Sequence, residues 1–451
     1  MFDSLRSLRF LNMGAVFFCL LAAGSYTQAE TLQEAVKYVV ETNPDVRTVV
    51  YNRLARDQQV KQARAGYFPE LGLIAGAGIQ EVDEPVDQSL EPWEFTLGLR
   101  QNVFRGLQDM NEIERQEARV RSEAYIIQTE AEDNALETAR VYLQVLRKKD
   151  FLDLANENLS VHKRIADQIR LRSESGVDRK ADMNQVDSRL ALAESNVVVT
   201  KTNLIDADTN YQRIVGHLPE NLVKPEAPAS VLPQSLEEAQ ELTITGDPTL
   251  KSAEEDLVAR HSQDEVAKAP FWPIVDIEID KTWSEDLTYG LNTDEENLIA
   301  LLRVRYNFFR GWRDRARKVE TTYLISEARE IRNNTHRQIV ERTRLSWMAY
   351  TSAMDRIKYL EDRVTSAAAT SQAYAKQWDI GRRTLLDVLD AEAELIEAKK
   401  ELLDAQYDGL FAQYRIMNNI GQLVHTLGLE WPEEAYVKDE EKPKKEEKKD
   451  S

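Results

Sequence analysis

Two stretches of the chain carry apolar or small residues at alternating spacings of three and four. The first runs from Met183 to Ile214 and the second from Val388 to Asn419. This alternation repeats every 3.5 residues, which indicates helices that wrap around neighbours with a left-handed supercoil. Many of the positions hold Ala, Gly or Thr, so the backbones can approach closely. An ordinary apolar stripe on a buried helix is the alternative, and the strict alternation over both stretches favours coiled packing.

Glycine and proline are absent from long parts of the chain, which predicts long helices. Four such stretches form two matched pairs of 69 and 39 residues, and only Gly409 interrupts one of them: Leu107–Ser175 and Trp312–Ile380, then Val177–Val215 and Arg382–Ile420. A continuous helix of 69 residues would be roughly 100 Å long at 1.5 Å per residue. Two shorter helical stretches, Leu32–Ala65 and Leu236–Ala269, are each broken near the start by a proline.

Three segments of about ten residues alternate in character with a period of two, which predicts strands, and a fourth, Leu71–Gln80, is Gly-rich and apolar and is a possible strand. These segments are Leu71–Gln80, Phe95–Phe104, Val275–Trp283 and Leu298–Phe308. Ten residues is the length that a tilted transmembrane β-strand needs, although a soluble sheet packed on one side would alternate similarly. The charged side chains share one face, which would line a barrel lumen as an anionic wall or form a solvated outer surface: Asp276, Glu278, Asp280, Arg303 and Arg305.

The chain repeats itself with a period of about 205 residues. Six landmarks recur in order, three at a spacing of 204 and three at 205: Thr31 with Ser235, Asn43 with Asp247, Phe68 with Trp272, Phe104 with Phe309, Gly176 with Gly381, and Gly216 with Gly421. A period this long indicates a duplicated domain half rather than a short solenoid unit. We therefore divide the chain into a first repeat, 30–230, with a hairpin at 71–104, and a second, 231–428, with a hairpin at 275–308.

Four strands cannot close a barrel by themselves. In lipid an open edge would leave backbone groups without hydrogen bonds, at a cost of several kcal/mol each. If the strands span a membrane, several chains must share one barrel. Eight strands would leave almost no lumen, so three or more chains suit a channel. The fold class we expect is mainly α, with a small transmembrane β part.

Both ends of the chain differ from this pattern. Residues 1–29 read as a secretory signal, with an apolar stretch at Phe10–Ala23 that is too short to span a bilayer. Cys19 lies inside this stretch, and the residues before it do not fit a lipid attachment site. No later segment approaches 18 apolar residues, so no transmembrane helix is expected. We expect residues 429–451 to form a charged, disordered tail.

Composition excludes several functions. The chain has 58 Lys and Arg against 78 Asp and Glu, a formal charge of −20, which disfavours nucleic acid as a partner. A single Cys excludes a disulfide framework and a multi-Cys zinc site. The five His are scattered, and no HExxH, GxSxG, P-loop or Rossmann motif is present. We therefore expect no enzyme activity, no cofactor and no metal.

Several segments resemble the TolC family of outer-membrane channels. They are Thr31–Val36, Asn43-Pro44, Ala65–Leu71, Gln101–Gly106 and, most specifically, Gly381–Glu392. The resemblance covers nearly all of residues 31–421. It implies a homotrimer with a 12-stranded β-barrel in the outer membrane of a Gram-negative bacterium and a tunnel of 12 long helices across the periplasm.

Two further segments, 168–177 and 213–219, look most like the type I secretion branch of this family. That branch joins a periplasmic membrane-fusion adaptor and an inner-membrane ABC transporter, and it exports unfolded protein such as an RTX-like toxin, protease or adhesin. The outer-membrane component of an RND multidrug efflux pump is the near alternative. A periplasmic coiled-coil adaptor or scaffold is a remote one, because an adaptor would usually carry one hairpin and a membrane anchor.

The turns at Gly176 and Gly381 are the expected position of the gate. Asp387 and Asp390 match the family's acidic ring at the periplasmic entrance, where threefold symmetry would gather carboxylates that attract cations. Asp182, Arg383 and Trp378 fall where the family places the contacts that hold the inner helix pair closed. On periodicity alone, Asp182 and Asp387 could equally lie on a solvated helix face near an N-terminus. Adaptor docking is expected at the same tips, at Gly176, Val177, Gly381, Leu385 and Leu386.

Overall fold

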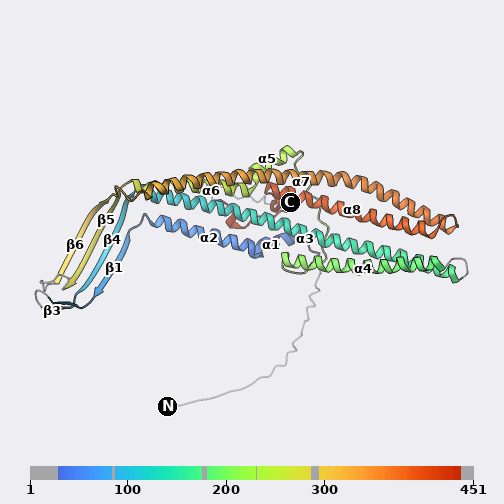
Figure 1. Cartoon of the computed structure of the whole chain (residues 1–451), viewed down its shortest axis with the longest axis horizontal. Coiled ribbons are helices and arrows are strands. Elements are labelled where there is room, and N and C mark those ends of the chain that lie inside the picture. Colours follow the sequence, from blue (N-terminus) through green and yellow to red (C-terminus); the bar gives the residue numbers. More distant parts are fainter. Residues whose placement is uncertain (1–28, 84–86, 175–179, 230, 286–293, 438–451) are drawn as a thin grey trace, which may run out of the picture.

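The computed structural model describes residues 29–83, 87–174, 180–229, 231–285 and 294–437. The molecule is elongated, with a small sheet at one end and long helices reaching to the other (Figure 1). Residues 1–28 of the expected signal segment and the sequence after Val437 lie outside the described residues. Among the described helices, none is both long enough and apolar enough to cross a membrane.

The two long helix pairs are confirmed. The long helices α3 (Gln108–Glu174) and α7 (Arg313–Asp379) have 67 residues each, which corresponds to roughly 100 Å. The helices α4 (Lys180–Val215) and α8 (Leu385–Ile420) have 36 residues each. Each shorter helix returns alongside its long partner, as Figure 1 shows. A Cβ added at Gly409 would lie 2.7 Å from the terminal methyl of Met354, so the small residue permits this close packing.

The shorter helices break at the two prolines, as the sequence predicts. In the first half, α1 (Leu32–Thr42) precedes α2 (Pro44–Ala65), and in the second α5 (Leu236–Gly246) precedes α6 (Pro248–Lys268). Asn43 and Asp247 cap the second helix of each pair: their side chains accept hydrogen bonds from backbone N–H groups of its first turn. Proline at the first helical position loses no intrahelical bond, so the break is local.

Four strands form one antiparallel sheet in the order β1-β4-β5-β6. Their bounds are Glu70–Ala77, Trp93–Arg105, Ile274–Glu285 and Asp294–Arg305. All four predicted strands are therefore present. Strand β6 begins before Leu298 and ends at Arg305, so Tyr306 and Phe308, which the alternation placed in the strand, lie beyond it. A two-stranded hairpin of β2 (Gln80–Val82) and β3 (Gln88–Leu90) was not predicted.

The helices that adjoin the sheet follow the same lateral order as the strands. Contacts run from α2 to α3, from α3 to α6 and from α6 to α7. Each strand is joined in sequence to the helix at its own place in this order; a short 3-10 turn at Ala269–Phe271 leads from α6 to β5. The strands of the sheet therefore continue into a row of four helices in the same order (Figure 1).

The main core lies where α1, α3, α4 and α8 meet the end of the chain. After α8 come the short α9 (Leu423–Thr426) and a 3-10 turn at Glu433–Ala435. Residues 429–437 pack against α2 and α3, so the prediction of a disordered tail from residue 429 is wrong for this part. The reason is that Leu429, Trp431 and Val437 are apolar and pack against the helices. The prediction treated residues 429–451 as one segment, whose composition is dominated by the charged residues after Val437.

Glu132 of α3 holds this C-terminal segment in place. The carboxylate is 1% exposed and accepts hydrogen bonds from Leu423 N at 2.8 Å, Val424 N at 3.2 Å and Trp431 Nε1 at 2.9 Å. The two backbone donors belong to the first turn of α9, where a carboxylate satisfies N–H groups that have no partner within the helix. One α3 turn away, Gln128 donates to the carbonyl of Ala435 at 2.9 Å.

Candidate functional site

The turn between α7 and α8 is built around Gly381. Its backbone has φ +75°, a left-handed conformation that glycine adopts without strain. The N–H of Gly381 donates to Trp378 O and that of Arg382 to Gln377 O, both at 2.8 Å, which is the pattern of a Schellman turn. The predicted turn is confirmed here. The matching turn with Gly176 and Val177 lies outside the described residues.

Asp387 forms part of the N-terminal cap of α8. Thr384 Oγ1 receives the N–H of Asp387 at 3.3 Å, and the Asp387 carboxylate accepts from Thr384 N at 3.0 Å and from the Thr384 hydroxyl at 2.8 Å. This reciprocal arrangement is a capping box. The hydrogen bonds from the Thr384 side chain and backbone lower the pKa of Asp387, and Arg383 lowers it further. Asp387 is therefore charged and held in a defined direction at neutral pH.

A small apolar cluster joins the two hairpins at their tips, and we call it the tip cluster. It combines residues of α3, α4, α7 and α8: Ile165, Ala166, Ile169, Val186, Trp378, Leu385, Val388 and Leu389. Leu385 is only 6% exposed, so its expected role as an exposed docking residue is wrong. It follows the cap residue Thr384 on the inward face of α8. Leu386, one position on, points away and is 45% exposed.

Two of the three predicted latch residues make cation–π contacts at the tips. Arg383 donates to Gln377 Oε1 at 3.1 Å, and its guanidinium lies 4.0 Å from the centre of the Tyr374 ring. These contacts stay within the α7–α8 hairpin. By contrast, the guanidinium of Arg172 lies over the Trp378 ring, 5.0 Å from its centre, and this contact links α3 to α7. Asp182 lies in the first turn of α4 and is half-buried.

Asp390 is ion-paired, which the sequence did not predict. Its carboxylate accepts from the Arg189 guanidinium of α4 at 3.0 Å. This pair joins the two hairpins, whereas Arg170 and Asp187 join α3 to α4 within one hairpin at 3.1 Å. Arg189 lies 201 residues before Asp390, and neither the heptads nor the repeat alignment pairs the two positions. No sequence signal could have found the contact.

The five charged strand residues share one face of the sheet, as the alternation predicts. Asp276 is fully buried and binds Asn102 Nδ2 at 2.8 Å, Arg100 at 3.0 Å and Arg305. Glu278 binds Arg303 and lies 3.5 Å from Arg305. Asp280 lies opposite Gly98, where a Cβ would come within 2.7 Å of the carboxylate.

The expected anionic wall is wrong for this cluster. Its carboxylates on β5 are flanked by arginines of β4 and β6, so acids and bases balance: Asp276, Glu278 and Asp280 against Arg100, Arg303 and Arg305. The opposite face is apolar, with leucine and isoleucine side chains well exposed in the single chain. Near its far end Phe95 and Trp283 stack at 5.5 Å, and Trp93 donates to Glu285 at 2.7 Å.

The chemistry of these sites is that of charge and packing. In the described part of the chain, no group of three or more His, Cys, Asp or Glu side chains could hold a metal ion. His162 of α3 is buried near the tips, and burial and the charge of Arg189 lower its pKa. Neutral imidazole is therefore the form that this position accommodates.

Comparison with known proteins gives consistent matches along the chain. A family model described as "Outer membrane efflux protein" matches residues 24–217 and 241–422. Outer membrane efflux protein BepC of Brucella suis biovar 1 is 20% identical over 424 residues, covering 92% of each chain. Outer membrane protein TolC of Escherichia coli K12 is 25% identical over 398 residues, covering 82% of this chain and 78% of the relative.

Solved structures share the fold at lower identity. A structure of CusC superposes with a TM-score of 0.78 at 15% identity, covering 86% of this chain and 91% of that one. The outer-membrane channel OprN gives a TM-score of 0.75 at 18% identity, with 86% and 89% covered. The outer membrane protein VceC of Vibrio cholerae gives 0.74 at 16% identity, with 89% and 97% covered.

Proposed function

The chain belongs to the outer membrane efflux protein family, and on that premise we propose that it is the outer-membrane channel of a type I secretion system. Channels of this family are passive and are not enzymes; they form trimers and work with an adaptor and an inner-membrane transporter. The protein is thus an efflux channel of the outer membrane. The proposed cargo is unfolded protein, delivered by an ABC transporter through a periplasmic membrane-fusion adaptor. Segments 168–177 and 213–219 support this choice of branch.

The two free edges of the sheet carry the channel proposal. Strands β1 and β6 are its edge strands, and every described residue of both is exposed in the single chain. Free strand edges cannot remain in lipid, because their backbone groups would lack hydrogen bonds. Three copies that pair β1 of one with β6 of the next form a closed barrel of 12 strands, wide enough for a lumen.

Exposed aromatic side chains occur on both edges at the same level. Tyr67 and Phe68 follow α2 at its junction with β1, and they are 54% and 68% exposed. Phe309 and Trp312 occupy the junction of β6 with α7, with 68% and 67% exposed. An apolar surface on α7 continues past Trp312 through Val319 and Tyr323. We propose that these surfaces meet between neighbouring copies.

Cysteine cross-linking tests this assembly. The only native Cys, Cys19, lies in the predicted signal, so Phe68→Cys and Phe309→Cys introduce the only thiols of the exported chain. In the double variant, a short bismaleimide applied to outer membranes should give a covalent trimer on denaturing gels. Each single variant, treated identically, is the control and should remain monomeric or form no trimer. A double variant that cross-links only within one chain would refute the pairing of these edges.

We propose that the gate lies at the tips of the hairpins. Asp387 and Asp390 of three copies would form the acidic ring, and Asp182, Arg383 and Trp378 would hold the hairpins in the closed arrangement. The tip cluster and the Arg189–Asp390 pair support a closed resting contact between the hairpins. Opening would separate the hairpins and release the Asp390 carboxylate from Arg189. Cation selectivity would then rise as the gate opens.

Adaptor docking is proposed at the exposed tip residues Gly381 and Leu386, together with Gly176 and Val177. Leu386→Ala should abolish export while trimers persist in the outer membrane. Leu385→Ala is an informative comparison, because its buried side chain contributes to the tip cluster instead of to the surface. Normal export by the Leu386 variant would rule out docking at this position.

Deletion of the channel gene, followed by complementation, distinguishes a type I secretion channel from the channel of an RND pump. In a type I system, loss of the channel gene should remove a large protein from the culture supernatant and leave drug susceptibility unchanged. Export should return with the wild-type gene. Increased drug susceptibility with an unchanged supernatant would instead assign the channel to an RND pump. Cross-linking followed by mass spectrometry should then identify either an ABC transporter or an RND pump with its adaptor.

A further inference from the structure

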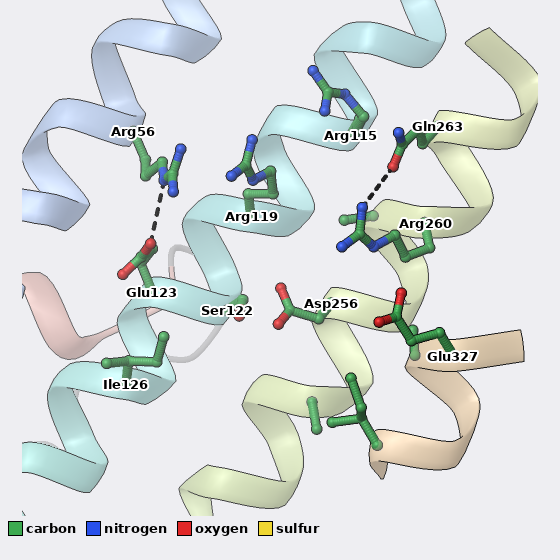
Figure 2. Close-up of a pocket in the computed structure, with 14 residues that line it drawn as sticks. Arg56, Arg115, Arg119, Ser122, Glu123, Ile126, Asp256, Arg260, Gln263 and Glu327 are labelled. Carbon is green, nitrogen blue, oxygen red and sulfur yellow. Dashed lines mark hydrogen bonds and ion pairs between the residues drawn. The ribbon is translucent and has the colours of Figure 1, made fainter. Parts of the chain in front are cut away.

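A cavity of about 340 Å³ lies among α2, α3, α6 and α7 (Figure 2). Its volume is at the lower end of the range found for small-molecule sites. Four arginines line it, from three different helices: Arg56, Arg115, Arg119 and Arg260. Three carboxylates also line it: Glu123, Asp256 and Glu327. The cavity plays no part in the gate or in the sheet.

Most of these arginines are already bound by protein groups. Arg56 donates to Glu123 Oε1 at 3.2 Å, and Arg260 donates to Gln263 Oε1 at 2.9 Å. Arg115 makes two hydrogen bonds to Glu112, at 2.8 Å and 2.5 Å. These bonds fix three guanidinium groups around the cavity. The three groups are therefore held in place before any ligand enters, with the charges of Arg56 and Arg115 offset in part by Glu123 and Glu112.

Arg119 is different from its neighbours. It lies between Arg56 and Arg115 in Figure 2, and in the described part of the chain it makes no hydrogen bond or ion pair. Burial, followed by the charges of Arg56 and Arg115, lowers the pKa of Arg119. Asp256 and Glu123 act on this pKa in the opposite direction, but neither accepts a hydrogen bond from Arg119. A half-buried guanidinium that makes no hydrogen bond and lies beside two like charges is unfavourable by itself. An anion on this side of the cavity would remove that cost.

We propose that this cavity binds a small polyanion, with phosphate or carboxylate groups, against Arg119. A guanidinium offers two parallel N–H donors to such an oxyanion, and Arg56 and Arg115, each paired with a glutamate, border the site on either side. The carboxylates of Asp256 and Glu327 line the cavity on the side of α6 and α7, so they would repel the anion toward α2 and α3. The site thus takes one small anion with a defined orientation.

The cavity lies on the face of α3 opposite to the C-terminal segment. Arg119 precedes Gln128, which holds that segment, by nine residues, or two and a half helical turns. In the ring of the proposed channel, and resting on that proposal, the cavity and the C-terminal segment would lie on opposite faces of the wall that α3 helps to form. The anion that binds at Arg119 would therefore not compete with docking of the C-terminal segment.

Calorimetric titration of the purified full-length protein tests the site without requiring transport. Pyrophosphate and citrate are titrated separately in 100 mM NaCl, so the two arms compare phosphate with carboxylate chemistry. Wild type should bind at least one of them. Arg119→Gln should weaken binding about tenfold or more. Arg119→Lys should weaken it less, because lysine keeps the positive charge although it lacks the two parallel N–H donors of the guanidinium. Asp256→Asn should strengthen binding.

Arg329→Gln is the matched control. It makes the same change of charge on α7 at the same level, two residues after Glu327 and therefore on the opposite side of the helix. Its binding should stay within twofold of wild type. Absence of binding by wild type, or an equal loss in the control, would overturn the site. Either result would leave the channel proposal untouched, because trimer cross-linking and conductance are measured independently.

Discussion

The docking of the C-terminal segment on Glu132 should weaken as the pH rises. Burial raises the pKa of Glu132 to about 8, although three N–H donors hold its charged form. When the segment opens, the carboxyl meets water and its pKa returns toward 4.5. A group whose pKa is raised by docking contributes stability below its ordinary pKa, and the contribution is lost as the pH rises through the raised value. Between pH 6 and 8 the loss is roughly 2 kcal/mol, or on the order of 50-fold in the opening equilibrium.

Nearby titrating groups do not reproduce this effect. The nearby charge of Asp133 adds to the raised pKa of Glu132. The His425 ring meets the Trp431 ring edge to face, with 4.3 Å between their centres, and burial lowers the pKa of His425. A lowered histidine pKa stabilises docking as the pH rises, which is the opposite sign. A fall in stability toward pH 8 therefore identifies Glu132.

Hydrogen exchange measured by mass spectrometry on peptides from 421–437 provides the assay. Protection factors divide out the intrinsic dependence of exchange on pH, so they report the opening equilibrium. In wild type they should fall on the order of 50-fold between pH 6 and 8. Glu132→Gln cannot titrate and should show no such fall, at a lower overall protection. Wild-type protection that is constant with pH, or a fall of equal size in the variant, would refute the reasoning.

Three further predictions concern the tips. Gly381→Ala should lower stability by about 1 kcal/mol, because φ is +75° while the added Cβ meets open space; thermal unfolding measures this. Leu389→Ala should lower the free energy of unfolding by about 2–5 kcal/mol, because it leaves a cavity in the tip cluster. Leu386 is exposed, so Leu386→Ala should lower it by less than about 0.5 kcal/mol; thermal unfolding measures both changes. Combined Asp387→Ala and Asp390→Ala should abolish block by divalent cations in planar bilayers, and persistent block would argue against an acidic ring.

Much of the fold could be predicted because its signals are local in sequence. Helix lengths follow from where glycine and proline are absent, and the period of two identifies each strand without reference to its neighbours. The breaks at Pro44 and Pro248 follow from the missing N–H of proline alone. The repeat then relates one half to the other. None of these inferences requires knowledge of which segments touch.

The contacts between distant segments could not be predicted in the same way. Leu385 and Leu386 are chemically equivalent in sequence, and only the direction set by the Thr384 cap buries one and exposes the other. The acids of β5 looked unbalanced because their partners, Arg100 and Arg305, belong to other strands. Register, which decides such pairings, depends on the whole sheet.

The Arg189–Asp390 pair changes how an acidic ring should be understood in this chain. Both acids have an arginine nearby, but Asp390 is paired with Arg189 at 3.0 Å, whereas Asp387 is held by its cap and lies 3.7 Å from Arg383. Separation of the hairpins leaves the Asp387 cap intact, because its partner Thr384 belongs to the same helix, but breaks the Asp390 pair, because Arg189 belongs to α4. In the proposed gate, opening would therefore free the Asp390 carboxylate and leave Asp387 as it is. The charge at the entrance would then depend on hairpin geometry, because Asp387 is bound within its own hairpin and Asp390 is bound to the other one.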